Sequence, residues 1–319
     1  ATVSTDTTVK AVDTTATVID PDQASIWKMF QCCGGNVVAD ATTKEVFVDN
    51  ATESADFGTA HVRLATPDDA TNDKMYIFSD LRGTVDVDAS LGDVPKLKFS
   101  LKGNSFDPVA TTKQTASFGT QTTAVAPSVL FSTVKVAQLI NISDTETFSA
   151  TGLTGNTSLA ISNSGARCTV TLTSHDIPVG TLRRIRVASA SNALMNGDFV
   201  AYALSATKLQ FYAKGVTGSA GATGATITKG QTYAPSTFCF STLTAANFFG
   251  FDYQRYLTGC DQGFAKGATP TDVAVTMLED QVGGSSFNPD QNISKFFAGI
   301  IKFGSTNTVA YMWDTLQIA

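Results

Sequence analysis

The side chains that most often carry enzyme chemistry are sparse in this chain. It contains 2 histidines, His61 and His175, which are too few for a histidine-rich metal centre. Ser174, His175 and Asp176 are consecutive, but a catalytic triad is assembled in space, and neighbours along a strand point to opposite sides. The sequence also lacks a GxSxG elbow, a Walker A loop and an HExxH motif. We therefore predict a protein that is not an enzyme and that binds no metal and no cofactor.

Two carboxylates, Asp86 and Asp88, alternate with apolar residues, so a strand places both on one face. Such a pair could bind a cation or exchange protons, which requires surroundings that separate the two pKa values. The commoner origin of this pattern is a solvated strand face. Asp86 and Asp88 are therefore candidate functional acids of an exposed sheet face, with no catalytic role assigned.

The cysteines indicate where the chain folds. Their number is odd, their spacing is irregular, and none forms a CxxC pair. A disulfide-stapled secreted domain would be denser in cysteine. We expect reduced thiols in a protein that folds in a cytosol, and the N-terminus shows no pattern of a secretory signal. The residues concerned are Cys32, Cys33, Cys168, Cys239 and Cys260.

Composition favours strands. The chain has 319 residues, 16% of them charged, and a formal net charge of -6. Threonine, a β-branched residue that favours strands, is abundant. No run approaches the roughly 18 apolar residues of a membrane span. The mild acidity argues against a stable nucleic-acid complex, which needs clustered Lys and Arg, but not against nucleic acid sliding past. The prediction is a mainly β protein.

A helix is predicted near the N-terminus, and a hairpin further along. Asp20 is a candidate N-cap, Trp27 and Phe30 lie on an apolar stripe, and Gly34 would end the helix. Residues 83–91 alternate, and so do the residues that follow the turn after them, which predicts two paired strands with one buried face. The second strand would place Leu97, Phe99 and Leu101 on that face and Lys96, Lys98 and Lys102 on the other.

The middle of the chain has a different texture, richer in Ser, Ala and Gly. Asn196-Gly197 stands between two strand-like runs and predicts a tight hairpin turn. Glycines spaced by three over residues 215–224 predict a flexible linker at the end of this module. Further on, residues 288–291 repeat the helix-start chemistry of residues 20–23, which predicts a second helix and leaves an internal repeat open. Residues 307–319 predict a closing strand.

A predicted helix that ends in Cys33-Gly34 is followed by residues 80–85, by residues 92–99 and by Gly103 in a hairpin pattern. In these features the sections on either side of the middle module resemble the tail tube proteins of long-tailed phages, particularly the non-contractile ones. The resemblance lies in a short helix ending in Cys-Gly, followed by a glycine- and proline-punctuated hairpin with a buried aromatic residue. The C-terminal section fits the family more loosely. The residues that carry the resemblance are Cys33, Gly34, Arg82, Gly83, Gly92, Pro95, Phe99 and Gly103.

At Gly180 and at residues 185–187, 196–199 and 208–211, the middle section resembles a small β module that recurs in phage tail proteins and in the first catalytic-cysteine half domain of ubiquitin-activating enzymes. No catalytic residue is carried over. Residues 1–19 show little pattern and indicate an extended N-terminal arm, and the change of texture indicates an all-β module at 134–235. The resemblances imply a tail-tube domain in two parts, at 20–133 and 236–319, with that module as an inserted decoration domain. The implied fold is a tail-tube-type β-sandwich with a flanking helix, interrupted by the inserted domain.

The tail-tube resemblance implies a homo-oligomer in the virion, assembled in the host cytoplasm with other tail proteins and without a membrane. Six copies would form a ring, and rings would stack into a hollow conduit for genome DNA; some related tubes instead fuse two domains and form trimeric rings. An acidic lumen would let DNA pass without specific binding. Asp86 and Asp88 are the candidate lumen-facing acids, although Lys96 and Lys98 would partly cancel their field.

Three other functions remain open at this point. The chain could be another virion protein, such as a capsid decoration or tail terminator protein. A surface adhesin or carbohydrate-binding module would suit the Thr- and Ser-rich β layout, although a signal sequence is missing. A hydrolase is the third alternative.

Overall fold

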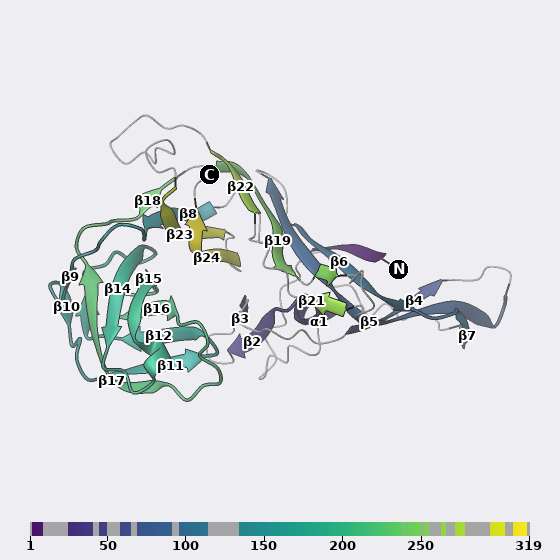
Figure 1. Ribbon diagram of the computed structural model, residues 1–319, viewed down its shortest axis with the longest axis horizontal. Helices are drawn as coiled ribbons and strands as arrows, with labels where there is room; N and C mark the ends of the chain where they lie inside the picture. The colour runs from purple at the N-terminus through teal and green to yellow at the C-terminus, as the bar shows by residue number, and fades with distance from the viewer. Residues whose placement is uncertain are drawn as a thin grey trace. The chain divides into compact units, whose positions relative to one another are not determined.

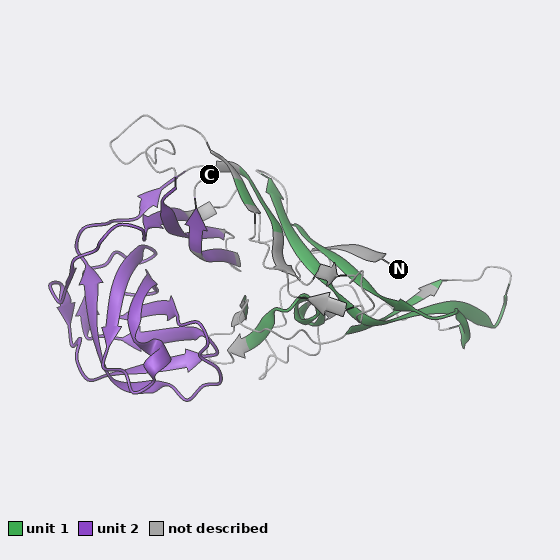
Figure 2. Cartoon of the chain, in the orientation of Figure 1, with its two compact units in different colours: residues 1–128, 242–275 green, residues 129–241, 276–319 purple. Residues whose placement is uncertain are grey.

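Strands dominate the protein, so the mainly β class predicted from composition is confirmed (Figure 1). Each of two compact units builds its own sheets: residues 1–128 with 242–275, and residues 129–241 with 276–319 (Figure 2). The computed structural model describes residues 2–8, 25–40, 45–49, 58–64, 69–90, 96–113, 134–238, 240–250, 252–254, 263–265, 272–277, 294–303 and 309–317.

The first unit contains the helix α1 and an open antiparallel sheet. Its elements are β1 (Thr2–Thr8), α1 (Ser25–Cys32), β2 (Asn36–Asp40), β3 (Glu45–Asp49), β4 (Gly58–Leu64), β5 (Asn72–Ser90), β6 (Lys96–Ser105), β7 (Val109–Thr112), β19 (Phe240–Gly250), β20 (Asp252–Gln254), β21 (Gly263–Ala265) and β22 (Asp272–Met277). The sheet has the strand order β1-β6-β5-β19-β22, while β4 and β7 pair with the N-terminal half of β5. The predicted hairpin is present as β5 and β6.

Strand β5 has 19 residues and changes partners along its length. The register against β6 shifts between Ser79 and Arg82, and Asp80 between them has a positive φ of 54°. A residue in this left-handed conformation marks a bulge, which bends a strand and increases its twist. The Asp80 carboxylate accepts hydrogen bonds from Ser79 Oγ at 3.1 Å and from Asn104 Nδ2 at 3.0 Å, which holds the bulge against β6.

Helix α1 packs on the buried side of this sheet. The rings of Trp27 and Phe30 stack with centroids 6.1 Å apart, and the Phe30 ring meets Phe99 of β6 edge-on at 5.1 Å. All three aromatic residues are buried. The helix ends at Cys32, and Gly34 in the turn that follows has a φ of 81° suited to glycine. The predicted apolar stripe and helix end are confirmed; the predicted N-cap Asp20 lies outside the described residues.

The second unit contains a small β-barrel and a four-stranded sheet. Its elements are β8 (Val134–Asn141), β9 (Phe148–Ser149), β10 (Leu153–Thr154), β11 (Leu159–Ser164), β12 (Arg167–Thr171), β13 (Ser174–His175), β14 (Leu182–Ala188), η3 (Ala193–Met195), β15 (Gly197–Ala203), β16 (Lys208–Tyr212), β17 (Ala222–Gly230), β18 (Ser236–Thr237), β23 (Phe296–Phe303) and β24 (Val309–Gln317). The barrel follows the order β11-β12-β16-β15-β14-β17 and is closed by pairing of β11 with β17.

The barrel interior is apolar and tightly enclosed. Inward-facing side chains from every barrel strand form one core, in which Phe211, Ile185 and Val170 are each 0% exposed. Closure leaves no free sheet edge among the six barrel strands, and free edges are where strands from other chains pair. The barrel is therefore complete without a partner.

The four-stranded sheet has the order β18-β8-β23-β24 and packs against the outside of the barrel. Ile140 and Ile300 of this sheet share a buried cluster with Leu182 and Tyr202 of the barrel. The buried amide Oε1 of Gln138 accepts a hydrogen bond from the Leu182 backbone N–H at 2.9 Å. This side-chain bond joins the sheet to β14 within the same unit.

The compact units divide the chain differently from the predicted domain boundaries. Strand β8, which begins the predicted inserted domain at 134–235, pairs along its length with β23 from the predicted second part at 236–319. That second part is shared between the units, with 242–275 in the first and 276–319 in the second. Pairing between residues more than 150 positions apart along the chain leaves no trace in local composition.

Two local predictions in this unit are wrong. The apolar residues that follow the predicted helix start lie in a strand and not in a helix: Phe296–Phe303 form β23, which has a paired strand on each side and consecutive buried residues from Phe297 to Ile301. A short apolar run of this kind fits a fully buried strand and a helix equally well. The predicted helix start at residues 288–291 lies outside the described residues. The glycine-rich segment 215–224 is part of the module, because Gly218 O accepts the Gly165 N–H at 2.8 Å and β17 begins within the segment, at Ala222.

Candidate functional site

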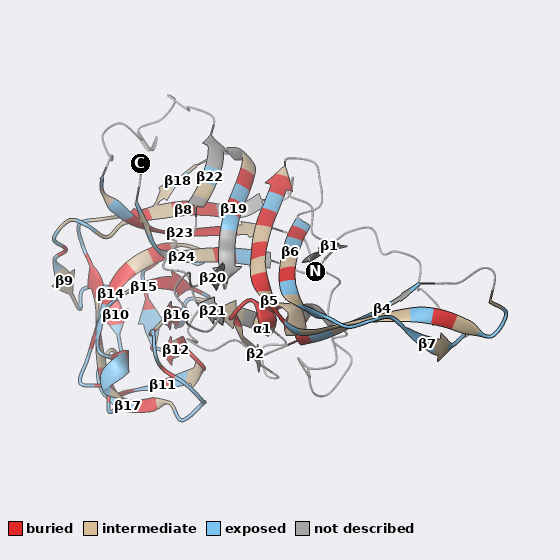
Figure 3. Ribbon diagram, turned by 45° about the vertical axis from the view of Figure 1, so that its right-hand side comes forward, coloured by how far each residue is buried: buried red, intermediate tan, exposed pale blue. Residues whose placement is uncertain are grey.

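The hairpin of β5 and β6 presents one charged face and one buried face. Along β6, exposed lysines alternate with Leu97, Phe99 and Leu101, which are 4%, 0% and 6% exposed. Along β5, Val85 and Val87 are 0% and 2% exposed on the same buried face (Figure 3). The predicted orientation of both strands is confirmed. Any chemistry of this hairpin is therefore confined to its other face.

The predicted acids stand opposite lysines on that face. In the antiparallel register Asp86 is paired with Lys98, and Asp88 is paired with Lys96. Asp86 is half-buried, whereas Asp88 and both lysines are exposed. Directly opposed residues of an antiparallel pair have Cβ atoms about 5 Å apart, so each carboxylate lies within the field of one ammonium group. Such exposed pairs contribute only a few tenths of a kcal/mol each to stability.

The charged face of this hairpin carries more basic than acidic side chains. Because alternate residues of a strand lie on the same face, the two carboxylates share this face with four basic side chains. At the end of the hairpin nearest the bulge, Arg82 is paired with Lys102, a juxtaposition of like charges. On these two strands the face is thus mixed, with positive charge in excess. The charged residues of this face are Arg82, Asp86, Asp88, Lys96, Lys98 and Lys102.

The family-motif residues that the structure describes are positioned for packing. Gly83 lies where β5 approaches β6 so closely that a Cβ atom would overlap the carbonyl oxygen of Ser100. Gly103 meets β5 in the same way at Ser79. Phe99 is the aromatic residue beneath α1, and Arg82 is half-exposed. Gly92 and Pro95 lie outside the described residues.

The described cysteines, Cys32, Cys33 and Cys168, are buried and form no disulfide among the described residues. Burial raises the pKa of Cys33, and the neighbouring Cys32 and Asp86 add to this effect. Burial likewise raises the pKa of Cys168 to about 11. Burial thus favours the protonated form of the Cys33 and Cys168 thiols in the folded protein. Cys239 and Cys260 lie outside the described side chains.

The prediction from Asn196-Gly197 is confirmed for the pairing of the two flanking strands, but these two residues do not form the tight turn between them. Strands β14 and β15 are antiparallel neighbours, but Val187 is paired with Gly197, so a loop containing η3 separates them. The Asn196 side chain closes this loop: its Oδ1 accepts the Ala190 N–H at 2.8 Å, and its Nδ2 donates to the Ala190 carbonyl at 3.0 Å. Asn196 thus acts through its side chain as a loop clamp.

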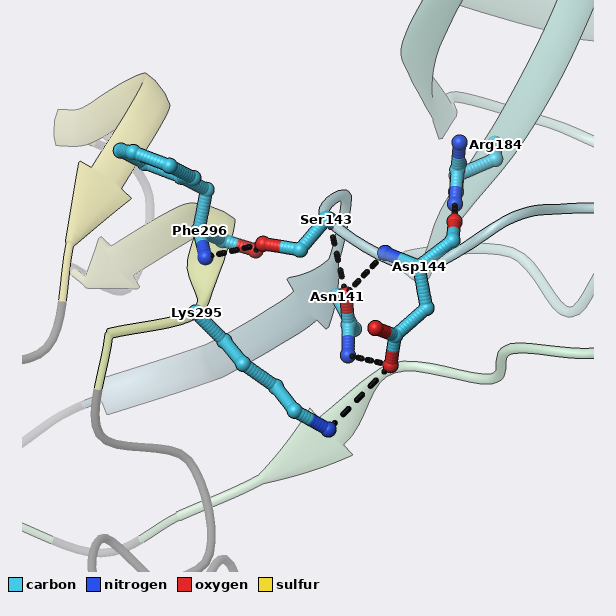
Figure 4. A network of polar contacts seen from close by, with 6 residues as sticks. All are labelled: Asn141, Ser143, Asp144, Arg184, Lys295 and Phe296. Carbon is cyan, nitrogen blue, oxygen red and sulfur yellow. Dashed lines mark hydrogen bonds and ion pairs between the residues drawn. The ribbon is translucent and has the colours of Figure 1, made fainter.

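A polar network joins the sheet and the barrel of the second unit where the chain passes between them (Figure 4). Asn141 Oδ1 accepts the Asp144 N–H at 3.2 Å, and Lys295 Nζ lies 3.2 Å from Asp144 Oδ2. From the barrel, Arg184 Nη1 donates to the Asp144 carbonyl at 2.7 Å. The hydrogen bond from Lys295 lowers the pKa of Asp144. Sequence inspection did not single out these residues.

Glu146 connects the segment by which the chain enters the barrel to the segment by which it leaves. Its carboxylate accepts backbone N–H groups from Thr147 at 3.0 Å, Gln231 at 3.1 Å, Thr232 at 2.8 Å and Tyr233 at 3.3 Å. Burial alone would raise the pKa of Glu146, but these amides outweigh it and lower the pKa. The carboxylate therefore fixes the segment before β9 to the segment after β17.

The consecutive Ser174, His175 and Asp176 do not assemble a triad. Ser174 is exposed, His175 is buried with no hydrogen-bond partner for either ring nitrogen among the described residues, and Asp176 forms an ion pair with Lys229. Within the described part of the chain no group of three His, Cys, Asp or Glu side chains could hold a metal ion. None of the helices described is long and apolar enough to cross a bilayer.

The comparisons with known proteins add no relative. No family model, no curated protein and no solved structure matches this chain.

Proposed function

We propose that this protein is the structural subunit of a phage tail tube, in which copies join into rings and rings stack into a hollow conduit for DNA. The observation that carries the proposal is the two-faced hairpin of β5 and β6. It lies inside an open sheet, with the Phe99 face covered by α1 and with a polar face of alternating charges. A subunit lining a conduit needs one face that builds its own core and one that tolerates water and DNA.

The sheet edges support assembly. Strand β1 ends one side of the sheet and β22 ends the other, and neither has a second partner strand among the described residues. Unpaired edges invite pairing with another chain, and closing a ring removes them. The closed barrel of the second unit offers no such edge. The four-stranded sheet of the second unit also ends in strands with one described partner each, β18 and β24, so the proposal assigns the assembly contacts to the open sheets and none to the barrel strands.

The pairing of acids with lysines on this face supports the passage of DNA. A lysine row on a conduit wall would bind phosphates and displace their counterions. The carboxylates of Asp88 and Asp86 stand opposite Lys96 and Lys98 and offset their charge. We infer that these acids act as local charge partners for the lysines, so that the wall does not hold the DNA.

Electron microscopy of the purified full-length protein tests the proposal. Negative staining at increasing protein concentration should show rings or hollow tubes, and the mass of a ring distinguishes six copies from three. Discrete particles that bind capsids or tail ends would instead indicate a decoration or terminator protein. A monomer that binds glycans would indicate an adhesin. Either of these results would contradict the proposal of a tail tube subunit.

A further inference from the structure

Lys229 is a buried lysine at one end of the barrel. It lies on β17 in step with the inward-facing Ala225 and Ile227, and its register partner on β14 is the core residue Ile185. Lys229 is only 5% exposed. Burying an ammonium group among apolar side chains is costly unless a counter-charge meets it. A lysine at this position therefore demands a specific partner.

That partner is Asp176, whose Oδ1 is in direct contact with Lys229 Nζ. Asp176 directly follows β13, and its backbone N–H donates to the Gly152 carbonyl at 3.0 Å. A Cβ atom at Gly152 would overlap the Asp176 carboxyl group, so only glycine leaves room for it there. Amine and carboxyl group are thus both held by fixed backbone, and such positioning is what accelerates reactions between neighbouring groups.

We propose that Lys229 and Asp176 join in an intramolecular amide bond, a covalent cross-link between β17 and the loop after β13. One proton first passes from the Lys229 ammonium to the Asp176 carboxylate, giving a neutral amine and a carboxylic acid. The amine nitrogen then attacks the Asp176 carboxyl carbon, and the bond from that carbon to the hydroxyl oxygen breaks. The hydroxyl leaves with a second proton from the nitrogen, so one water is released and one N–H remains on the amide.

Burial distinguishes this pair from the other Lys–Asp pair of the same unit. The side chains of Lys295 and Asp144 are 39% and 36% exposed, and both charges keep much of their hydration. The Lys229 side chain is 6% exposed, so replacing its charge by a neutral amide relieves a desolvation cost. The Asp176 side chain is 53% exposed, which gives the released water a path to solvent. We expect the cross-link at Lys229 and none at Lys295.

Intact-mass spectrometry of the denatured full-length protein tests the proposal. The wild type should weigh one water less than its sequence, and digestion should release a branched peptide that contains both Lys229 and Asp176. K229R and D176A should have their full sequence masses. D176N should form the same amide by losing ammonia, so its mass should equal that of the cross-linked wild type. D144A is the matched control and should still lack one water.

Two results would overturn the cross-link. A wild-type protein that keeps its full sequence mass after purification and prolonged incubation has not formed it. A water loss that persists in K229R would come from cyclisation of an aspartate onto its own backbone and not from Lys229. The branched peptide is sought in the wild type itself, so the decision does not depend on whether a variant folds. Tube formation is a separate readout and does not enter this test.

Discussion

Asp86 on β5 stands directly opposite Lys98 on β6, on the hairpin face opposite to the buried Val85 and Phe99. The next outward pair along the hairpin repeats the arrangement with Asp88 and Lys96. Two carboxylates thus accompany two lysines on a face that also carries Arg82 and Lys102. The two carboxylates therefore offset the charge of the two lysines opposite them. Their removal should leave a face with a larger positive charge.

The double charge reversal D86K/D88K should convert this face into a strongly basic one. If the face lines a conduit, assembled particles of the variant should retain DNA that the wild type releases. The dependence of DNA binding on salt should steepen, by about 0.9 in the slope of log K against log salt for each additional phosphate contacted. Filter binding over a range of salt concentrations measures this slope. K96D/K98D is the matched control and should weaken binding; equal behaviour of both variants would contradict the proposed role.

Phe99→Ala should destabilise the first unit by about 3–5 kcal/mol, because it removes a large, fully buried side chain and leaves a cavity beneath α1. Urea unfolding followed by tryptophan fluorescence is a suitable measurement, since Trp27 stacks on Phe30 next to this site. Thr84→Ala, on the other face of the neighbouring strand, should change stability by no more than about 0.5 kcal/mol. Similar losses in both variants would mean that the burial described here is wrong.

Gly83→Ala should cost about 1–3 kcal/mol, because the added methyl group would overlap the Ser100 carbonyl and push β5 and β6 apart. Thermal unfolding compared with that of Ser90→Ala on the same strand provides the measurement. An unchanged melting temperature for Gly83→Ala would show that the two backbones are further apart than described.

Glu146→Gln should destabilise the second unit by about 1.5–3 kcal/mol at neutral pH, since charge-assisted hydrogen bonds from several backbone amides are weakened. The pKa of Glu146 is lowered in the folded protein, so its contribution is present above the ordinary glutamate pKa of about 4.3 and is lost as the pH falls through the folded value. The difference between variant and wild type should therefore shrink on acidification.

Denaturant unfolding at a series of pH values measures this difference. Asp198→Asn is the control, because Asp198 pairs with Arg186 where both side chains are about half-exposed, at 43% and 51%. Its effect should stay below about 1 kcal/mol. A pH-independent effect of Glu146→Gln would show that packing at this position, and not its charge, matters.

Period-two alternation determined much of the first unit from the sequence alone. Leu97, Phe99 and Leu101 point one way because successive strand residues face opposite sides, and no other part of the chain is needed to infer it. The same holds for the helix α1, whose end before Gly34 the sequence predicts. What the sequence could not show is the bulge at Asp80, where a non-glycine residue with positive φ lies within the single 19-residue strand β5.

The tertiary structure alone decided which distant segments meet. β23 is a central strand because β8 and β24 flank it, and its apolar residues by themselves fit a helix equally well. Lys229 faces the barrel interior only once closure of β11 on β17 defines an interior. Alternation and capping act between near neighbours in the chain, whereas burial and charge pairing depend on contacts that only the folded chain creates.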